Sequence, residues 1–351
     1  MNNITDITQK KARNISYAFM VLMLAVVAWQ GLATPLLSAL FSYLALRALL
    51  LGKNPRKWTA IALFMILLAA ICYGFSMFVA DAAKSLPEIV EKLGPSVMSL
   101  AREYQVNLPF NDYDSLKAFV IEAATDRLPM VGHIARVVTT QLVFLIIGCI
   151  VAISIFLSPV LELGRPLNAS PRNLYSLCLD EVSARFSAFY RSFATVMGAQ
   201  LAISLINTAL TMIFVLATGM PHTIIIVGVT FLCGMLPVIG NLVSNAFIIG
   251  IGLTVSPTMA LAALAFLVTI HKLEYFLNSR IIGARIRNPL WLMLIGLLIG
   301  ERLMGIPGMI LAPVLLYYIK VEASGISLPA AKEVSVTESL TADPTQPPPA
   351  A

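Results

Sequence analysis

Charged residues are scarce in this sequence. Asp, Glu, Lys and Arg account for only 12% of its 351 residues, whereas hydrophobic residues account for 58%. Soluble globular domains contain about 25% charged residues, so the composition excludes an ordinary soluble protein. Long runs without charge are typical of helices that cross a bilayer. The sequence therefore predicts an all-α polytopic membrane protein with the lipid bilayer as its surroundings.

Cysteine and histidine are also rare, and the motifs of common enzyme classes are missing. The sequence has four widely separated cysteines and three histidines, without a disulfide framework or a metal-ligand spacing. It has no Walker loop, no dinucleotide-binding glycine fingerprint, no nucleophile elbow and no His-Glu-x-x-His motif. We therefore expect no enzymatic activity, no catalytic residues, no metal and no cofactor.

The basic residues form short clusters at the ends of the apolar runs. One cluster, Lys10, Lys11 and Arg13, precedes the first run, and another lies in the loop 52–58. Loops rich in Lys and Arg remain on the cytoplasmic side of a membrane protein. The clusters therefore place the N-terminus inside. The formal net charge of +6 indicates membrane orientation and no nucleic-acid partner.

The apolar runs predict about six full spans, at residues 15–33, 36–51, 59–80, 141–161, 193–217 and 257–269. The predicted organisation is a cytoplasmic N-terminus (1–14), a three-span scaffold (15–80), an extracytoplasmic helical insertion (81–139), a fourth span with a cytoplasmic amphipathic linker helix (140–192), a transport core (193–320) and a disordered cytoplasmic tail (321–351). We expect the insertion to be a helical cap, with a ligand-binding domain as the alternative. The linker helix has a regulatory surface as its alternative.

Two tips rich in Pro and Gly interrupt the core, at residues 236–241 and 301–308. Each tip separates two apolar arms of roughly 11 to 15 residues, whereas a spanning helix needs about 20. Short arms joined by a turn predict re-entrant helical hairpins, whose irregular backbone must be buried or line a wet cavity. Because the two hairpins enter from opposite faces, the core has the pattern of an inverted repeat. Six ordinary spans with two kinked helices are the alternative.

Polar residues in the core provide candidates for a solute pathway. Gln200, Ser204, Asn207, Thr208 and Thr211 recur at steps of three and four, so they share one face of an apolar helix. We predict that Gln200 and Asn207 contact a solute, with interhelical hydrogen bonding as the alternative. The tips and the helix after the first tip complete the predicted solute pathway with Pro237, Gly240, Asn241, Asn245, Gly305, Pro307 and Gly308. Asn241 has helix capping as an equal alternative.

Five residues of the core are candidates for ion or proton coupling: His271, Glu274, Arg280, Glu301 and Arg302. His271 and Glu274 are i, i+3 neighbours near the inner end of the last span, where they are suited to a proton relay or a coupling cation. The alternative is interfacial anchoring, with Glu274 paired to a neighbouring base such as Arg280. Glu301 and Arg302 lie at the second tip. They need partners if that tip lies at mid-membrane, and they are merely solvated if it reaches the interface.

Three motifs resemble the autoinducer-2 exporter family. They are Leu236–Asn241 (LPVIGN), Glu274–Gly283 (EYFLNSRIIG) and Gly305–Pro313 (GIPGMILAP). The order of the elements and the insertion also fit, so the resemblance covers about residues 15–320. One departure is Ser279, which stands where a proline is expected.

The resemblance implies a multi-pass transporter of the bacterial cytoplasmic (inner) membrane. It also implies a homo-oligomer, specifically a pentamer, whose hairpin-bearing half moves as an elevator. Members of this family are linked to export of the autoinducer-2 signal and to exchange of sodium or lithium for protons.

Three functional hypotheses remain open at this point. The first is a permease that exports a small polar solute, with autoinducer-2 as a candidate. The second is a sodium or lithium/proton antiporter that couples through the charged residues of the core. The third is a membrane scaffold that transports nothing and binds partners through its insertion and tail.

Overall fold

The structure is a computed structural model, and it describes residues 2–50, 56–103, 131–158, 174–237, 239–277 and 289–325. Most of these residues are helical, and none of them forms a strand. The helices are α1 (Asn2–Trp29), α2 (Ala33–Ala48), α3 (Lys57–Glu103), α5 (Val131–Leu157), α6 (Leu174–Thr218), α7 (Thr223–Gly234), α8 (Ile239–Val255), α9 (Pro257–Leu277), α10 (Leu290–Met304) and α11 (Ile306–Ser324). The predicted all-helical class is therefore confirmed.

Five helices are long and apolar enough to cross a membrane: α1, α3, α5, α6 and α11. Four of them contain spans predicted from the sequence, and this confirms the prediction of several membrane-spanning helices. The predicted second span is α2, which has only 16 residues. At 1.5 Å per residue it rises about 24 Å, less than the hydrocarbon thickness of about 30 Å. By length and composition α2 is therefore not a candidate span, and the predicted number of six full spans is not confirmed.

Three helices continue past the boundaries predicted for them. α3 runs through residue 81 into the predicted insertion. α6 runs through residue 192 and joins the linker helix to the fifth span over 45 residues. No proline interrupts α6, so the change from an amphipathic to an apolar pattern does not end the helix. α11 ends at Ser324, which makes residues 321–324 its last turn and not part of the tail.

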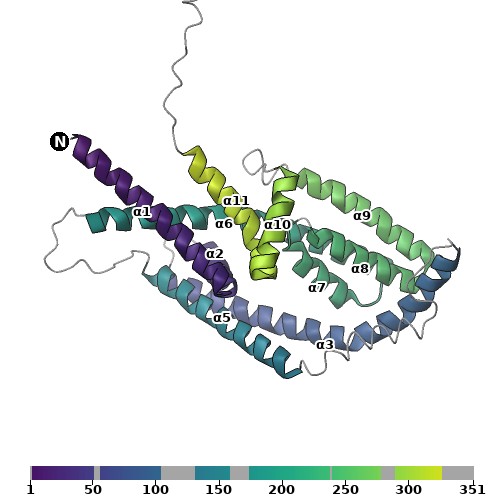
Figure 1. Ribbon diagram of the computed structural model, residues 1–351. Coiled ribbons are helices and arrows are strands. Elements are labelled where there is room, and N and C mark those ends of the chain that lie inside the picture. Colours follow the sequence, from purple (N-terminus) through teal and green to yellow (C-terminus); the bar gives the residue numbers. More distant parts are fainter. Residues whose placement is uncertain are drawn as a thin grey trace, which may run out of the picture.

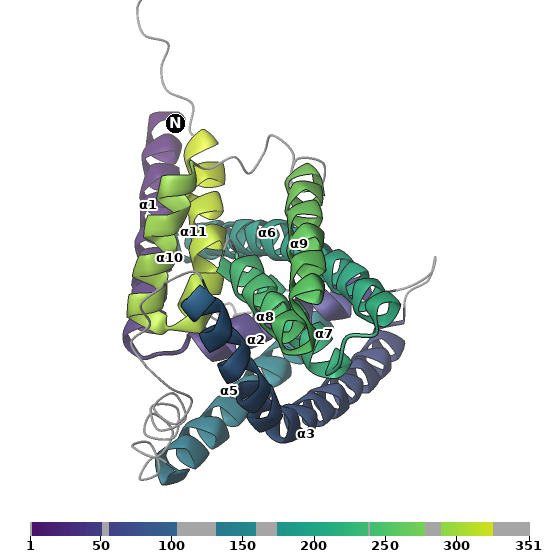
Figure 2. The same ribbon diagram turned by 90° about the vertical axis from the view of Figure 1, so that its right-hand side faces the viewer.

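α6 is the central element of the fold. Figure 1 shows it running across the molecule, with α1 and α11 crossing one end and α7 packed beside the other. In Figure 2, α1, α10 and α11 stand side by side, while α7, α8 and α9 form a separate group. One buried cluster joins α6 to α1, α2 and α11, and a second joins it to α3, α7, α8 and α9. Both groups of helices therefore pack against α6.

The part of the predicted insertion that the structure describes packs against the core. Ile89, on the extension of α3, is buried in one cluster with Met220, Ile225 and Ile248. Nearby, Lys92 pairs with Glu88 on the same helix at 2.7 Å, and this lowers the pKa of the Glu88 carboxyl. The start of the insertion is thus a helix seated on α7 and α8, whereas residues 104–130 lie outside the described ranges.

The two tips break the helices where the sequence predicts. α7 and α8 form hairpin 1, and α10 and α11 form hairpin 2. At the tip of hairpin 2, Gly305 has φ 64° and ψ −149°, a conformation that is essentially restricted to glycine. Pro307 follows in the first turn of α11, where its missing N–H costs no hydrogen bond. Local chemistry thus explains the sharp turn.

The arms of hairpin 2 touch backbone to backbone. A Cβ added to Gly308 would overlap the carbonyl oxygen of Gly300 and lie 2.6 Å from its carbonyl carbon. A Cβ added to Gly300 would in turn overlap the carbonyl oxygen of Gly308. The two glycines therefore permit a spacing of the arms that no other residue allows.

Candidate functional site

The polar face of α6 meets the end of α7. Gln200 donates from Nε2 to the carbonyl oxygen of Gly234 at 2.6 Å, and Ser204 donates from Oγ to the carbonyl oxygen of Phe231 at 3.0 Å. Both carbonyls belong to the last turn of α7, where a helix leaves its final C=O groups without intrahelical partners. The two α6 side chains therefore cap hairpin 1 from outside. This is the interhelical bonding that the sequence offered as the alternative for Gln200.

The tip of hairpin 1 is compact because glycines bring its backbone close to its neighbours. A Cβ added to Gly234 would lie 2.6 Å from Ser204 Oγ, and one added to Gly240 would overlap the carbonyl oxygen of Cys233. Leu236 donates its N–H back to Cys233 at 2.8 Å. Pro237 is buried beside this turn. The tip is thus a tightly packed turn held against α6.

One turn further along α6, polar groups are buried without partners. Asn207 is only 2% exposed, and neither its Nδ2 nor its Oδ1 has a hydrogen-bond partner within the described residues. The same holds for Oγ1 of Thr208. An unsatisfied buried polar group costs about 1–3 kcal/mol. Three such groups in adjacent residues are therefore unfavourable unless another contact satisfies them.

Hairpin 2 reaches α6 one turn before the caps. Leu311, near the start of α11, is buried in one cluster with Phe193 and Met197 of α6, and Met304 at the end of α10 packs against the same cluster. Met197 lies three residues before Gln200. The ends of both hairpins therefore meet the same short segment of α6.

The other residues predicted for the solute pathway are distributed around the two tips. Asn245 is buried on α8, and Asn241 is half-buried in the first turn of that helix. In hairpin 2, Gly308 is buried, Pro307 is half-buried and Gly305 is exposed. The structure thus places the residues of each tip together.

Four of the residues predicted for coupling belong to α9 and α10. His271 is exposed on α9, and Glu274 belongs to that helix, but the Glu274 side chain and all of Arg280 lie outside what the structure describes. Glu301 and Arg302 are exposed on the last turn of α10. Neither has an ion pair within the described ranges. The described residues also contain no group of three or more His, Cys, Asp or Glu side chains placed to hold a metal ion.

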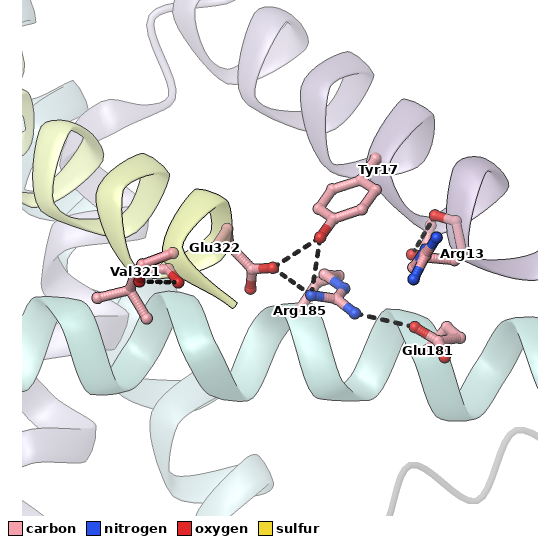
Figure 3. A network of polar contacts seen from close by, with 8 residues as sticks. Arg13, Tyr17, Glu181, Arg185, Val321 and Glu322 are labelled. Carbon is pink, nitrogen blue, oxygen red and sulfur yellow. Dashed lines mark hydrogen bonds and ion pairs between the residues drawn. The ribbon is translucent and has the colours of Figure 1, made fainter. Parts of the chain in front are cut away.

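Sequence reasoning missed a half-buried charge cluster at the other end of α6, shown in Figure 3. The Arg185 cluster consists of Tyr17 on α1, Glu181 and Arg185 on α6, and Glu322 on α11. Arg185 pairs with Glu322 through Nη1 and with Glu181 through Nη2 at 3.0 Å. Tyr17 donates its hydroxyl to Glu322 at 2.9 Å. The cluster therefore ties three helices together.

Burial makes this cluster different from an ordinary surface ion pair. The side chains of Arg185 and Glu322 are only 16% and 12% exposed, and the Arg185 guanidinium lies over the Tyr17 ring at 4.7 Å from its centroid. The i, i+4 spacing of Glu181 and Arg185 is visible in the sequence. Tyr17 and Glu322 are 168 and 137 residues away from Arg185, so no local pattern reveals them.

We expect the Ser204 cap to be important for the stability of hairpin 1. Ser204→Ala leaves the Phe231 carbonyl, which lies in the contact between α6 and α7, without its donor, and this should cost about 1–3 kcal/mol. Thermal unfolding of the purified protein in detergent measures this loss. The matched control is Ser76→Ala, because Ser76 is exposed and bonds only within its own helix. Equal melting of both variants would contradict the capping role.

Comparison with known proteins identifies the family. Residues 15–323 match the family described as AI-2E family transporter. A protein of Bacillus subtilis (strain 168) named "Putative transport protein YdbI" is 27% identical over 145 residues, which cover 40% of this chain. The chain thus spans 41% of the length of that relative. Because the family match covers nearly the whole chain, the protein belongs to the AI-2E transporter family.

Proposed function

We propose that the protein is a secondary transporter that exports a small polar solute past the segment of α6 where the two hairpins meet. The observation that carries this proposal is the convergence of both hairpin ends on residues 193–204 of α6. Broken helices offer freed backbone groups to a solute at such a point. The exposed side chains of α6 beside this face, such as Leu205 and Met212, are apolar, so polar groups here need a polar partner.

The finer features of the proposal are supported by this arrangement together with membership of the family. Hairpins 1 and 2 are re-entrant and form an inverted repeat, and the core of residues 193–320 moves as an elevator against the scaffold of residues 15–80. Gln200, Asn207, Asn241 and Asn245 line the solute pathway with the tip residues of both hairpins. The protein acts as a homo-oligomer in the bacterial inner membrane, with both termini in the cytoplasm. Autoinducer-2 is the first candidate solute.

Transport by everted membrane vesicles tests this proposal. We expect vesicles with the wild-type protein to accumulate autoinducer-2, and Asn245→Leu to reduce the initial rate roughly tenfold, the effect of losing about one buried hydrogen bond. The matched control is Asn14→Leu, an exposed asparagine in the middle of α1. Equal rates in both variants would remove Asn245 from the pathway.

The same vesicles separate export from cation exchange. Collapse of an imposed proton gradient by sodium or lithium reports antiport. If Glu274→Gln abolishes that signal and no solute accumulates, the antiporter hypothesis replaces this proposal. If neither signal depends on the protein, the scaffold hypothesis replaces it.

A further inference from the structure

The donors on α6 and the acceptors on α7 form two matching ladders. Gln200 meets Gly234, and Ser204, four residues later, meets Phe231, three residues earlier. The helices are therefore antiparallel here, with one bond for each turn. Donors one turn apart on one helix face acceptors one turn apart on the other. A shift of one whole turn therefore keeps the same faces of the two helices opposite each other.

The ladder on α6 is longer than the ladder on α7. Asn207 and Thr208 lie one turn beyond Ser204 on the same face. Asn207 is buried and Thr208 is half-buried, and the polar side-chain atoms of both are buried without a partner within the described residues. Each has a donor group, the Asn207 amide Nδ2 and the Thr208 hydroxyl. α6 thus has one more set of buried donors than hairpin 1 uses.

We propose that hairpin 1 has a second position on α6, one helical turn toward the C-terminal end of α6, in which Asn207 and Thr208 are the positioning residues. In this second position, Ser204 donates to Gly234, and Asn207 or Thr208 donates to Phe231. The shift is about 5.4 Å. Two interhelical bonds exist before and after it, so the movement leaves no freed carbonyl of α7 without a donor. One-turn shifts of packed elements are a known form of switching.

The consequence of the shift appears at Gln200. Its side chain loses Gly234 and becomes the free polar group at the segment where hairpin 2 also packs. If the proposed transport function is right, on which this inference rests, the shift alternately covers and uncovers Gln200 for the solute. It is a local movement inside the transport core and differs from motion of the core as a whole.

The short loop between α6 and α7 has the strained backbone that such a movement needs. His222, which precedes α7, has φ 59° and ψ 38°, and it is the single non-glycine residue with positive φ in the described part of the chain. Gly219, at the other end of the loop, has φ 66°. Left-handed conformations are costly for residues with a side chain. A shift of α7 changes these torsions, so the loop is the natural hinge.

Distances between spin labels on α6 and α7 test the proposal directly. Leu205 and Leu232 are exposed on the two helices, and each is replaced with a labelled cysteine after Cys72, Cys149, Cys178 and Cys233 are changed to alanine. Pulsed electron paramagnetic resonance of the protein in liposomes without solute gives the distribution of distances between the two labels. We expect a main distance and a minor one that differs from it by up to about 5 Å, the length of one turn.

Two sets of substitutions move the populations in opposite directions. Gln200→Leu removes a bond that only the main position contains, so the minor component should rise roughly tenfold relative to the main one. Asn207→Leu with Thr208→Val removes donors that only the second position uses, so the minor component should disappear, even in the Gln200→Leu background. A single, fixed role in packing would not produce opposite effects.

The control is Thr230→Val, which removes a buried hydroxyl that bonds only within its own helix. This variant should leave the distribution unchanged. The proposal is overturned if every variant gives the same single distance between the labels. It is also overturned if the minor component survives in Asn207→Leu/Thr208→Val. Gel filtration verifies folding, and the loss of unpartnered polar groups in that double variant should not impair it.

The readout also separates this inference from the proposed function. Liposomes without solute report the position of hairpin 1 whether or not the protein transports anything. Shifted populations together with absent transport would retain the second position and reject the export function. Transport with one invariant distance would reject the second position alone.

Discussion

Gly308→Ala is expected to prevent hairpin 2 from closing and to yield little or no folded protein. The added methyl group would meet the backbone of Gly300 and also lie 2.9 Å from Met304 Cβ. A flexible side chain moves aside at low cost, but a backbone carbonyl in a helix cannot. Overpacking of a core typically costs about 1–3 kcal/mol. Here the arms of the hairpin must separate, so we expect the cost to exceed that range.

The damage should spread from hairpin 2 to α6. Leu311 and Val314 of α11 are buried against Phe193 and Met197, and they leave that cluster when α11 moves. Gel filtration of detergent-solubilised protein after heating measures the remaining folded fraction. Gly74→Ala is the matched control, because a Cβ there has no atom within 4 Å. Alanine is favoured over glycine in a helix by about 1 kcal/mol, so this control should melt no earlier than wild type.

Gly308→Ala and Gly74→Ala add the same methyl group to a helical glycine, so they differ only in what that methyl group meets. Comparable melting of Gly308→Ala and wild type would show that the arms are further apart than the structure has them.

Arg185→Met is expected to destabilise the protein by about 3–5 kcal/mol, the usual effect of removing one partner from a buried ion pair. Glu322 is only 12% exposed in the intact protein, and without Arg185 its carboxylate keeps the Tyr17 hydroxyl as its one hydrogen-bond donor among the described residues. Desolvation of an unpaired carboxylate is the main cost. Thermal unfolding in detergent again gives the measurement.

A double substitution distinguishes lost charge pairing from lost packing. Arg185→Met with Glu322→Met removes both charges, and we expect most of the stability to return because apolar pairs often replace buried ion pairs without loss. Lys92→Met is the control, since it breaks an exposed pair with Glu88 and should cause no measurable change. Additive effects of the two Met substitutions would mean that Arg185 and Glu322 do not act as a pair.

The sequence was sufficient to predict the class of fold and the breaks in the helices. Apolar runs specify membrane helices through their length, and Pro237, Gly305 and Pro307 mark the breaks between helices through local backbone chemistry. Both kinds of information are local. The continuity of α6 was missed because a change of hydrophobic pattern at residue 192 resembles a boundary, although no residue there breaks a helix.

The candidate site was predictable only in part. The polar face of α6 was visible from residue spacing, which correctly put Gln200, Ser204 and Asn207 on one side. Their partners were not, because Gln200 and Ser204 bond to main-chain carbonyls that have no sequence signature. The Arg185 cluster was invisible for a related reason: its members come from three helices that only tertiary packing brings together.

The unbroken course of α6 has a mechanical consequence. Arg185 and Ser204 lie on the same helix, about 28 Å apart at 1.5 Å per residue. That separation is close to the hydrocarbon thickness of a bilayer, about 30 Å. A straight helix pivoted at the Arg185 cluster acts as a lever, so a tilt of about 10° there displaces the far end by about 5 Å. A tilt this small therefore moves Ser204 about as far as one helical turn, about 5.4 Å.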